Sequence, residues 1–357
     1  MAPRVLIAAG GTGGHVFPAL ACAEEFKERG WEVCFVGVGK RLEHEVFPKL
    51  GKYFVLKVNP LRQGGNLKKV WAFFRVLGSL KDAVSIIEAL KPQLVLGFGS
   101  YVSGPVIVAA WLKRVKRAIH EQNVLMGFSN RMSAPFAQRV FVSFEETLRL
   151  FPSPKVILTG NPVRKSIIEE ARGQKRGERF TLFVLGGSQG ARPINRAVVE
   201  VINRWSERDI EVIHQTGFED LEFVKEVSRK FGLGYTAFAF DPAVGRHYGR
   251  AHLVLCRAGA LTLAELGVVG RASILVPYPH AVDRHQLENA KVFERKGASK
   301  VIMQGELTPE RLFNTIKELK EDKDQRAEME KKALSLGKPW AAKVLVDRCE
   351  ELLHVQG

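Results

Sequence analysis

The sequence is poor in cysteine. Its four cysteines, Cys22, Cys34, Cys256 and Cys349, are widely spaced and contain no C-x-x-C pair. Disulfide frameworks and zinc fingers need more or closer cysteines than this. The pattern predicts a reduced cytosolic protein with neither a disulfide framework nor a zinc site.

Long hydrophobic runs are also missing. No run approaches the roughly 20 apolar residues of a transmembrane helix, and the longest one, residues 105–112, is far shorter. The apolar segment 5–9 leads straight into glycines, unlike a signal peptide. We therefore expect a soluble protein that is not exported.

Acidic side chains are too few to balance the basic ones. The chain has 54 Lys and Arg against 38 Asp and Glu, a net charge of +16. Such a surplus indicates an anionic partner: nucleic acid, anionic lipid or a diphosphate substrate. No zinc-finger spacing or RNA-recognition motif supports nucleic acid, so we expect no nucleic-acid partner.

Two glycine-rich turns are present, one in each half of the chain. Residues 5–9 read as a strand, residues 10–15 (GGTGGH) as a turn, and Pro18 opens a helical pattern. Residues 180–185 and 186–191 (GGSQGA) repeat the strand and the turn. Glycine permits positive φ and close approach to the backbone, and the following helix start favours an anionic ligand.

Neither turn has a common nucleotide signature. No lysine follows the glycines as in a P-loop, and no dinucleotide fingerprint with its distant acidic residue is present. The length of 357 residues indicates about two domains, each with strands alternating with helices, which is typical of parallel sheets. Predicted strands cover residues 5–9, 32–37, 94–97, 118–120, 139–142, 156–158, 180–185, 210–214, 235–240, 253–255, 273–276 and 300–303. The combination suggests a nucleotide-sugar enzyme more than a dehydrogenase.

Other polar or glycine-rich segments follow predicted strands. Residues 97–105 read as a third glycine loop, and residues 120–123 (HEQN) read as ligand contacts rather than core. HEQN is not the H-E-x-x-H of zinc proteases and sits at a strand end. Residues 256–265 read as a strand, a turn and a helix start, and residues 277–290 as a site that reads hydroxyl groups.

One helical segment suggests a membrane surface. Leu67, Val70, Trp71, Phe74 and Leu77 share one face of a helix that also carries Lys68, Lys69 and Arg75. With residues 61–62 before it and residues 111–117 later, it could form a basic, aromatic surface on a membrane. The alternative is an ordinary core stripe with solvated lysines.

A set of motifs occurs in a fixed order: GGTGGHVFPALA (10–21), YVSGP (101–105), HEQN (120–123), GNPVR (160–164), GGSQGA (186–191), GALT-x-x-E (259–265) and HQ-x-x-NA (285–290). Together they closely resemble the MurG family of bacterial peptidoglycan glycosyltransferases, in the GT-B superfamily. The resemblance implies an α/β fold of two Rossmann-like, doubly wound parallel-sheet domains facing across a cleft.

The resemblance also implies a division of labour. Residues 1–163 would form an acceptor and membrane-associating domain, residues 164–338 a UDP-sugar-binding domain, and residues 339–357 a C-terminal helix packing back on the first domain. The implied reaction is inverting, metal-independent transfer of N-acetylglucosamine from UDP-N-acetylglucosamine to the C4 hydroxyl of lipid I (undecaprenyl-diphospho-muramoylpentapeptide), giving lipid II. It implies no cofactor, an anionic membrane surface at the cytoplasmic face of the cell membrane, where the protein is peripheral, and contacts with other cell-wall synthesis proteins.

The resemblance assigns substrate contacts to individual residues. Those implied around the lipid diphosphate and the acceptor sugar are Thr12, Gly13, Gly14, Ser103, Gly104 and Asn123. Those implied around the UDP-sugar are Phe240 beside the uracil, Glu265 on the ribose, and Gln286 and Asn289 on the sugar hydroxyls. Groups suited to stabilise the departing diphosphate are Ser188, Arg164 and the helix start Ala260, Leu261, Thr262, Leu263 and Ala264.

A single displacement also needs a base for the incoming hydroxyl. His15 is the first candidate, because histidine titrates near neutral pH; the alternative is that it only caps the helix and orients the loop. Glu121 is the second candidate. Asp322 and Asp324 form a D-x-D sequence in a charged helical stretch, which we interpret as solvated surface, so no metal site is expected.

The chain departs from the family pattern at four places. Ser100 stands where the family usually has glycine, Met126 where it often has proline, Ala258 where it usually has serine, and Arg284 where it has an acidic or small residue. Ser100 leaves open how the acceptor diphosphate is held. Two other functions also stay open: a GT-B enzyme using another lipid acceptor, and a non-catalytic subunit that binds a sugar nucleotide or a lipid carrier.

Overall fold

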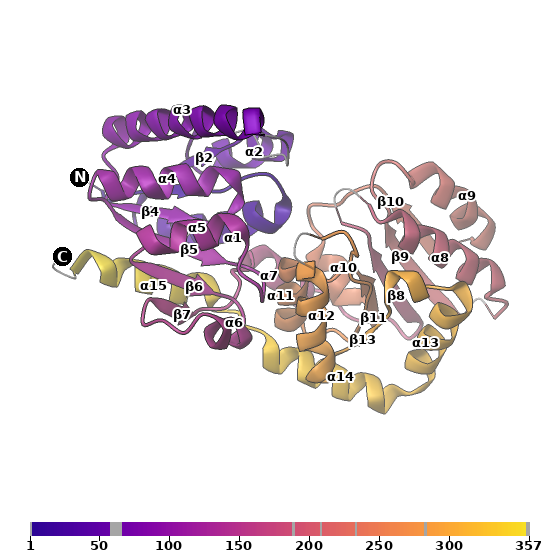
Figure 1. Ribbon diagram of the computed structural model, residues 1–357. Coiled ribbons are helices and arrows are strands. Elements are labelled where there is room, and N and C mark those ends of the chain that lie inside the picture. The colour runs from indigo at the N-terminus through magenta and orange to yellow at the C-terminus, as the bar shows by residue number, and fades with distance from the viewer. Residues whose placement is uncertain are drawn as a thin grey trace. The chain divides into compact units, whose positions relative to one another are not determined.

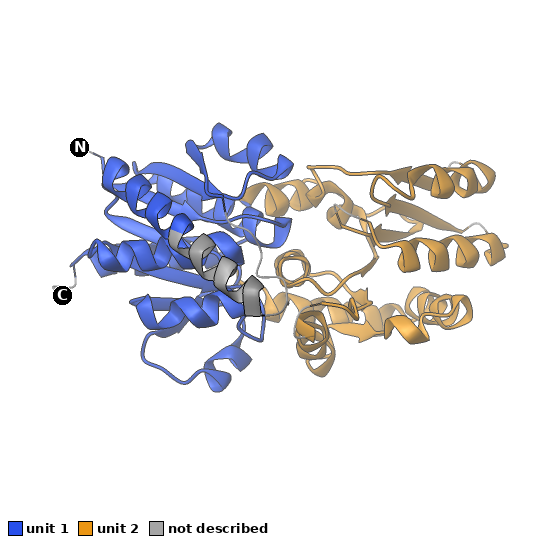
Figure 2. Cartoon of the chain, turned by 45° about the horizontal axis from the view of Figure 1, so that its top comes forward, with its two compact units in different colours: residues 1–164, 340–357 blue, residues 165–339 orange. Residues whose placement is uncertain are grey.

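The chain forms two compact units, residues 1–164 with 340–357 and residues 165–339 (Figure 2). The structure is a computed structural model that describes residues 2–57, 66–187, 190–207, 209–232, 234–281 and 284–354, with the backbone alone for residues 66–77. Each unit is a parallel sheet with helices packed on it (Figure 1).

The first unit has a seven-stranded sheet in the order β3-β2-β1-β4-β5-β6-β7. Its strands are β1 (Arg4–Ala8), β2 (Glu32–Gly37), β3 (Lys52–Val55), β4 (Leu94–Gly97), β5 (Lys116–Glu121), β6 (Arg139–Val142) and β7 (Val156–Leu158). Its helices are α1 (Gly13–Glu28), α2 (Arg41–Val46), α3 (Asn66–Leu90), α4 (Ser100–Leu112), α5 (Phe128–Ser133), α6 (Glu145–Leu150) and α15 (Ala341–His354), with short 3-10 helices η1 (Phe47–Lys49) and η2 (Ala134–Phe136).

Alternate residues of β1 serve two different cores. Val5 and Ile7 pack in a cluster with residues of α1 and α15, whereas Leu6 and Ala8 pack in a cluster with residues of α3 and α4. Side chains of a strand point to opposite faces in turn, so a strand that is apolar throughout must be covered on both sides. This explains why the predicted strand had no polar alternation.

The second unit has a six-stranded sheet in the order β10-β9-β8-β11-β12-β13. Its strands are β8 (Phe180–Leu185), β9 (Ile210–Gln215), β10 (Tyr235–Phe238), β11 (Leu253–Cys256), β12 (Ser273–Leu275) and β13 (Ser299–Val301). Its helices are α7 (Lys165–Arg172), α8 (Arg192–Arg204), α9 (Leu221–Phe231), α10 (Gly245–Arg250), α11 (Ala260–Val269), α12 (His285–Arg295), α13 (Pro309–Glu321) and α14 (Lys323–Leu336), with the 3-10 helix η4 (Gln304–Glu306).

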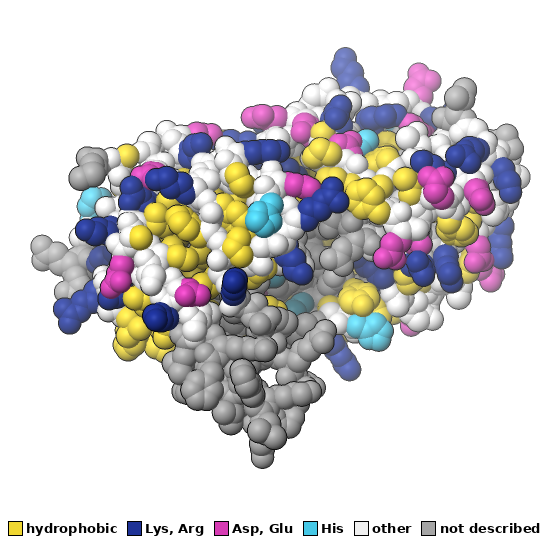
Figure 3. Space-filling model, turned by 90° about the horizontal axis from the view of Figure 1, so that it is seen from above, with side chains coloured by type: hydrophobic (Ala, Val, Ile, Leu, Met, Phe, Trp, Pro, Cys, Tyr) yellow, Lys and Arg dark blue, Asp and Glu magenta, His cyan; other side chains and the backbone are white. Residues whose placement is uncertain are grey.

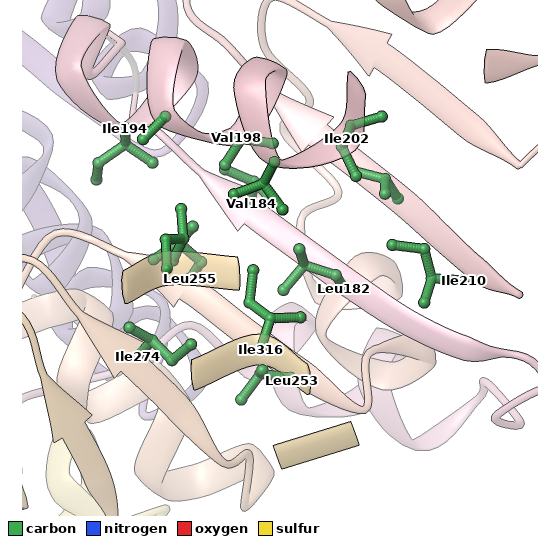
Figure 4. Close-up of a cluster of buried hydrophobic side chains, with 14 of the residues drawn as sticks. Leu182, Val184, Ile194, Val198, Ile202, Ile210, Leu253, Leu255, Ile274 and Ile316 are labelled. Atoms are coloured by element: carbon green, nitrogen blue, oxygen red, sulfur yellow. The ribbon is translucent and has the colours of Figure 1, made fainter. Parts of the chain in front are cut away.

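The core of the second unit follows the same logic. Leu182 and Val184 of β8 lie in a cluster with Ile194 and Val198 of α8 and with Ile316 of α13 (Figure 4). On the other face of β8, Phe183 meets Tyr248 of α10 edge to face, with ring centroids 5.4 Å apart. Helices thus cover both faces of this sheet too.

Both sheets reverse their strand order beside their first strand. The switch lies between β1 and β4 in the first unit and between β8 and β11 in the second. Ligands of doubly wound folds bind beyond the carboxyl ends of the strands at such a point. The expected α/β class with two doubly wound parallel sheets is confirmed, and β3 is a strand that the sequence reading missed.

Two helix starts differ from expectation. Helix α1 begins at Gly13, so Pro18 lies inside it instead of opening it; Pro18 costs one hydrogen bond there, the one that Gly14 would accept. Helix α4 begins at Ser100, so most of the expected glycine loop 97–105 is helix, and the true turn is residues 98–99.

Candidate functional site

Two helices of the first unit begin at its switch point. Gly11 has φ of +91° and Gly99 has φ of +80°, conformations that glycine adopts readily. A Cβ on Gly11 would lie 3.3 Å from Ser100 Oγ, so the turn after β1 and the turn after β4 lie in contact. The first turns of α1 and α4 carry no acidic side chain, and the N-terminal end of a helix favours an anion.

Three of the residues expected to contact the lipid diphosphate, and the residue expected to act as the base, lie at the start of α1. Thr12, Gly13 and Gly14 are partly or fully exposed, and His15 is half-buried with Nδ1 3.3 Å from Thr12 Oγ1. A Cβ on Gly99 would lie 3.4 Å from His15 Cδ2 and 3.5 Å from Nε2, which places the ring against the second turn. When Nδ1 carries the proton and donates to Thr12, Nε2 can accept one, as a base must.

The start of α4 is tightly constrained. Ser100 has φ of +64°, a left-handed value that glycine, the usual family residue, adopts at lower cost. Ser103 is fully buried, and its Oγ accepts a hydrogen bond from Gly99 N at 3.3 Å. The Ser103 hydroxyl is thus engaged inside the protein. Gly104 is half-buried, and a Cβ on it would lie 3.8 Å from Ser133 Oγ of α5.

Glu121 is the hub of the loop that follows β5. The residue is 2 % exposed. One carboxylate oxygen accepts from Asn123 N at 2.9 Å and Asn123 Nδ2 at 3.2 Å, and the other from Gly127 N at 2.9 Å and Asn130 Nδ2 at 2.8 Å. Both oxygens are engaged inside the protein, so the geometry favours Glu121 as the residue that orients Asn123.

The interpretation of HEQN as four ligand contacts is wrong for His120 and Gln122. Both are buried, with His120 Nε2 3.1 Å from the Gly160 carbonyl and Gln122 Nε2 3.1 Å from the Phe98 carbonyl. Burial lowers the pKa of His120 to about 4, so its ring is neutral near pH 7. Polar residues after a buried strand here tie neighbouring strand ends together.

Arg164 ends the first unit beside α1. Its guanidinium lies over the ring of Phe17, with Cζ 4.4 Å from the ring centroid. Its buried Nε has no hydrogen-bond partner among the described residues. The contact with α1 holds a positive charge on the same helix that carries His15.

The corresponding helix start in the second unit is that of α11. Gly259 caps it, Ala260, Leu261 and Thr262 form its first turn, and this turn carries no acidic side chain. Leu263 is fully buried in the core, and Ala264 is half-buried. The first-turn amides therefore present partial positive charge at the switch point. Ser188, which was expected to share this role, lies outside the described residues.

Glu265 and Asn289 are interior residues around this helix start. Glu265 is 6 % exposed, and its Oε2 accepts from Tyr248 Oη at 3.0 Å. Asn289 of α12 is fully buried, and its Nδ2 donates to the carbonyl of Ala258 at 3.3 Å. Asn289 thereby joins α12 to the turn that precedes α11.

Two further residues that were expected to contact the UDP-sugar are more accessible to solvent. Gln286 accepts a hydrogen bond from Tyr278 N at 3.0 Å through its Oε1. Phe240, just beyond β10, is 38 % exposed. These residues also follow carboxyl ends of strands in the second unit, as the ligand side of such a sheet requires.

Two buried polar groups beside the glycine turns were not predicted. Glu43 of α2 accepts a hydrogen bond from Gly11 N at 2.7 Å. Asn195 of α8 donates through Nδ2 to the Thr216 carbonyl at 2.9 Å, and its Oδ1 lies 2.9 Å from His214 Nε2. Sequence gives little signal for them, because a charged residue in a short helix and an asparagine in a long one are usually solvated.

Neither a metal centre nor a membrane span is evident in the part of the chain that the structure describes. That part contains no group of three or more His, Cys, Asp or Glu side chains placed to hold a metal ion. Asp322 of the D-x-D sequence caps α14 by accepting from Gln325 N at 2.8 Å. None of the described helices is long and apolar enough to cross a bilayer.

Comparisons with known proteins agree over almost the whole chain. Residues 5–142 match the glycosyltransferase family 28 N-terminal domain, and residues 181–345 match the family 28 C-terminal domain. A Myxococcus xanthus protein named UDP-N-acetylglucosamine–N-acetylmuramyl-(pentapeptide) pyrophosphoryl-undecaprenol N-acetylglucosamine transferase is 43% identical, over 98% of this chain and 93% of its own length. A Geobacter metallireducens protein of the same name is 40% identical, over 96% and 97%.

Solved structures show the same architecture. The crystal structure of Acinetobacter baumannii MurG superposes with a TM-score of 0.78 and 29% identity, covering 98% of this chain and 99% of that one. A UDP-N-acetylglucosamine 2-epimerase of Listeria monocytogenes, described as putative, reaches a TM-score of 0.70 at 14% identity, covering 100% and 98%. The second likeness concerns the fold alone.

Proposed function

Because this chain belongs to the MurG family of family 28 glycosyltransferases, we propose that it transfers N-acetylglucosamine from UDP-N-acetylglucosamine to lipid I and so makes lipid II. The observation that carries the proposal is the presence, in each unit, of a switch point where helices without acidic first-turn residues begin. The reaction has two substrates that each carry a diphosphate. One such switch point would serve each of them.

In the acceptor half, the lipid diphosphate would bind at the starts of α1 and α4. The backbone amides of Thr12, Gly13 and Gly14 and the hydroxyl of Thr12 would be the donors there, on residues that are exposed or half-buried. Asn123, oriented by Glu121, would contact the acceptor sugar. Gly104 of α4 is half-buried, and it would line the acceptor side of this helix start.

In the donor half, the diphosphate of the UDP-sugar would bind at the first turn of α11, with Ser188 of the glycine turn. Glu265 would accept from the ribose, and Phe240 would lie beside the uracil. Gln286 and Asn289 would read the sugar hydroxyls, and the interior contacts of Asn289 would fix its orientation.

The chemistry would be a single displacement that inverts the anomeric carbon. His15 Nε2 would take the proton of the acceptor C4 hydroxyl while Nδ1–H donates to Thr12. Charge on the departing diphosphate would be stabilised by the α11 amides and by Arg164, without a metal ion. His15 as a residue that only orients the loop remains the competing hypothesis.

The acceptor is a lipid, so the protein would work at the cytoplasmic face of the cell membrane. At the end of α4, Trp111 and Leu112 are 46 % and 51 % exposed, and Lys113 and Arg114 follow them on the surface. Figure 3 shows one face of the molecule, where hydrophobic side chains lie among lysine and arginine side chains. The helix face of Trp71 and Phe74, expected to share this role, lies outside the described side chains.

The test is transfer of labelled N-acetylglucosamine from its UDP donor to a short-chain lipid I analogue with EDTA present. We expect a β-1,4-linked disaccharide product, and His15→Ala should lower kcat by about 100-fold or more with little change in UDP affinity. No transfer by the wild-type protein would refute the function. Transfer that needs an added metal ion would refute metal independence, and an unchanged kcat in His15→Ala would remove His15 as the base.

A further inference from the structure

We infer that Glu43 is a positioning residue for the acceptor half of the reaction, an inference that rests on the proposed function. Glu43 lies on α2 and its side chain is fully buried. Its carboxylate holds the glycine turn that carries Thr12 to His15, and it does so from behind, inside the protein. Glu43 would touch neither substrate.

The carboxylate joins two loops at the carboxyl edge of the first sheet. Oε1 accepts from Gly11 N at 2.7 Å, in the turn after β1. Oε2 accepts from Val38 N at 2.8 Å and Gly39 N at 2.9 Å, in the turn after β2, and from Tyr53 Oη at 2.7 Å. Hydrogen bonds to an ionised carboxylate are about twice as strong as neutral ones, so this is a firm tether.

Two glycines make room for this carboxylate. A Cβ on Gly10 would lie 2.9 Å from Glu43 Oε1, and a Cβ on Gly37 would overlap Oε2. The first glycine of the GGTGGH turn is therefore required by a group of the protein itself. The glycines of this motif therefore make room for a carboxylate of the protein as well as for the anion of the substrate.

The tether decides which amides remain for the acceptor. Gly11 N is occupied by Glu43, whereas His15 N and Val16 N both donate to the Thr12 carbonyl at 3.1 Å. The amides of Thr12, Gly13 and Gly14 lie between these two sets, and they are the ones that would be presented to a diphosphate. Glu43 thus fixes both the anion-binding amides and the start of the helix turn that carries His15, where a shift of about 1 Å costs much of the rate.

Glu43→Gln tests this by replacing one carboxylate oxygen with an NH2 group. If the glutamine carbonyl accepts from Val38 N and Gly39 N, its NH2 group faces Gly11 N. Two donors then face each other, and the bond to Gly11 is lost. Keeping the Gly11 bond instead would lose two others. The substitution should therefore release Gly11 and leave the turn after β2 in place.

Tyr53→Phe is the matched control. It removes one donor to the same carboxylate and one acceptor from Gly39 N, and it leaves the bond to Gly11 intact. Both variants lose a buried hydrogen bond, so both should be somewhat less stable. The variants should differ in the acceptor half alone.

Three measurements decide the matter: kcat/KM for the lipid I analogue, Kd for UDP by calorimetry, and hydrogen exchange of a peptide covering residues 9–16. We expect Glu43→Gln to lower kcat/KM for the acceptor at least tenfold and to speed exchange in this peptide. The Kd for UDP should stay within twofold, and Tyr53→Phe should keep kcat/KM and exchange near the wild-type values.

Two results would overturn the inference. One is acceptor kinetics within twofold of wild type in Glu43→Gln; the other is an equal loss in Glu43→Gln and Tyr53→Phe, which would mean a general effect on stability. A wild-type protein that transfers no sugar would refute the proposed function. Even then, unchanged exchange at residues 9–16 in Glu43→Gln would separately refute the tether.

Discussion

His214 shows how a single buried side chain can make stability depend on pH. Its Nδ1 lies 2.7 Å from Tyr235 Oη and its Nε2 2.9 Å from Asn195 Oδ1. Asn195 Nδ2 already donates to the Thr216 carbonyl and to Asp220 Oδ2. Asn195 Oδ1 must therefore accept, which leaves His214 Nε2 as the donor and Nδ1 as the acceptor from Tyr235. The network fits a neutral ring.

We predict that the second unit loses stability as the pH falls below about 6.5. Burial lowers the pKa of His214 from 6.5 to about 3, so above 6.5 the folded and unfolded states both carry a neutral ring. Below 6.5 the unfolded state binds a proton that the folded state does not. The free energy of unfolding should then fall by about 1.4 kcal/mol per pH unit from this residue, down to about pH 3.

Urea unfolding of the wild type and of His214→Gln between pH 7.5 and about 4.5 measures this slope. The variant will be less stable at neutral pH, because Asn195 and Tyr235 lose their partner. Its free energy of unfolding should nevertheless depend less on pH, by about one proton. Parallel curves for the two proteins would show that His214 is not the titrating group.

Individual polar residues were the least predictable part of the site. A glycine-rich turn is recognisable from its composition, so Gly11, Gly13 and Gly14 could be placed from the sequence. Glu43 could not, because its role depends on a contact across 32 residues of chain. The interpretation of HEQN was wrong for a related reason. The sequence does not distinguish a buried histidine, which burial keeps neutral, from a histidine that binds a ligand.

Strands and helices were predictable because their signals are local. All the predicted strands are present, most within two residues of their observed ends, since a doubly covered strand is an unbroken apolar run. The strand β3 was missed because it is an edge strand with the burial pattern exposed, half-buried, half-buried, exposed. The start of α4 was missed because glycine, serine and proline read as loop, whereas the packing of α4 on α5 overrides propensity there.

Helix α15 is the clearest case of an element whose partner is remote in sequence. Leu345, Val346 and Cys349 are buried in the same cluster as residues of β1 and α1. Arg29 pairs with Asp347 at 2.7 Å and with Glu350 at 2.6 Å, and Trp31 Nε1 donates to Glu350 at 3.0 Å. The last helix of the chain thus completes the core of the first unit.

We predict that Leu345→Ala destabilises the first unit alone, by about 2–5 kcal/mol, the usual cost of a leucine-sized cavity. Hydrogen exchange should quicken in β1 and α1 and stay unchanged in β8 and α8. Leu319→Ala, at an equally buried position in the core of the second unit, should give the reverse pattern. Equal quickening in both units after either change would mean that they unfold as one cooperative body.

At the scale of the whole molecule, two features could bind a membrane: the net charge of +16 and the exposed apolar residues at the end of α4. We predict that both contribute to binding of vesicles that contain anionic lipid. Lys113→Gln with Arg114→Gln should weaken binding by about 2 kcal/mol, roughly 30-fold, at low salt. This loss should shrink as salt screens the attraction.

Trp111→Ser with Leu112→Ser should weaken the same binding through lost apolar burial, so its effect should persist at high salt. Phe218→Ser is the control, because Phe218 is 70 % exposed and belongs to the second unit. Co-sedimentation with vesicles of defined anionic content, at several salt concentrations, measures all three. If Phe218→Ser lowers binding as much as the α4 pair, attachment is a diffuse property of a cationic protein, and α4 is not the membrane-facing element.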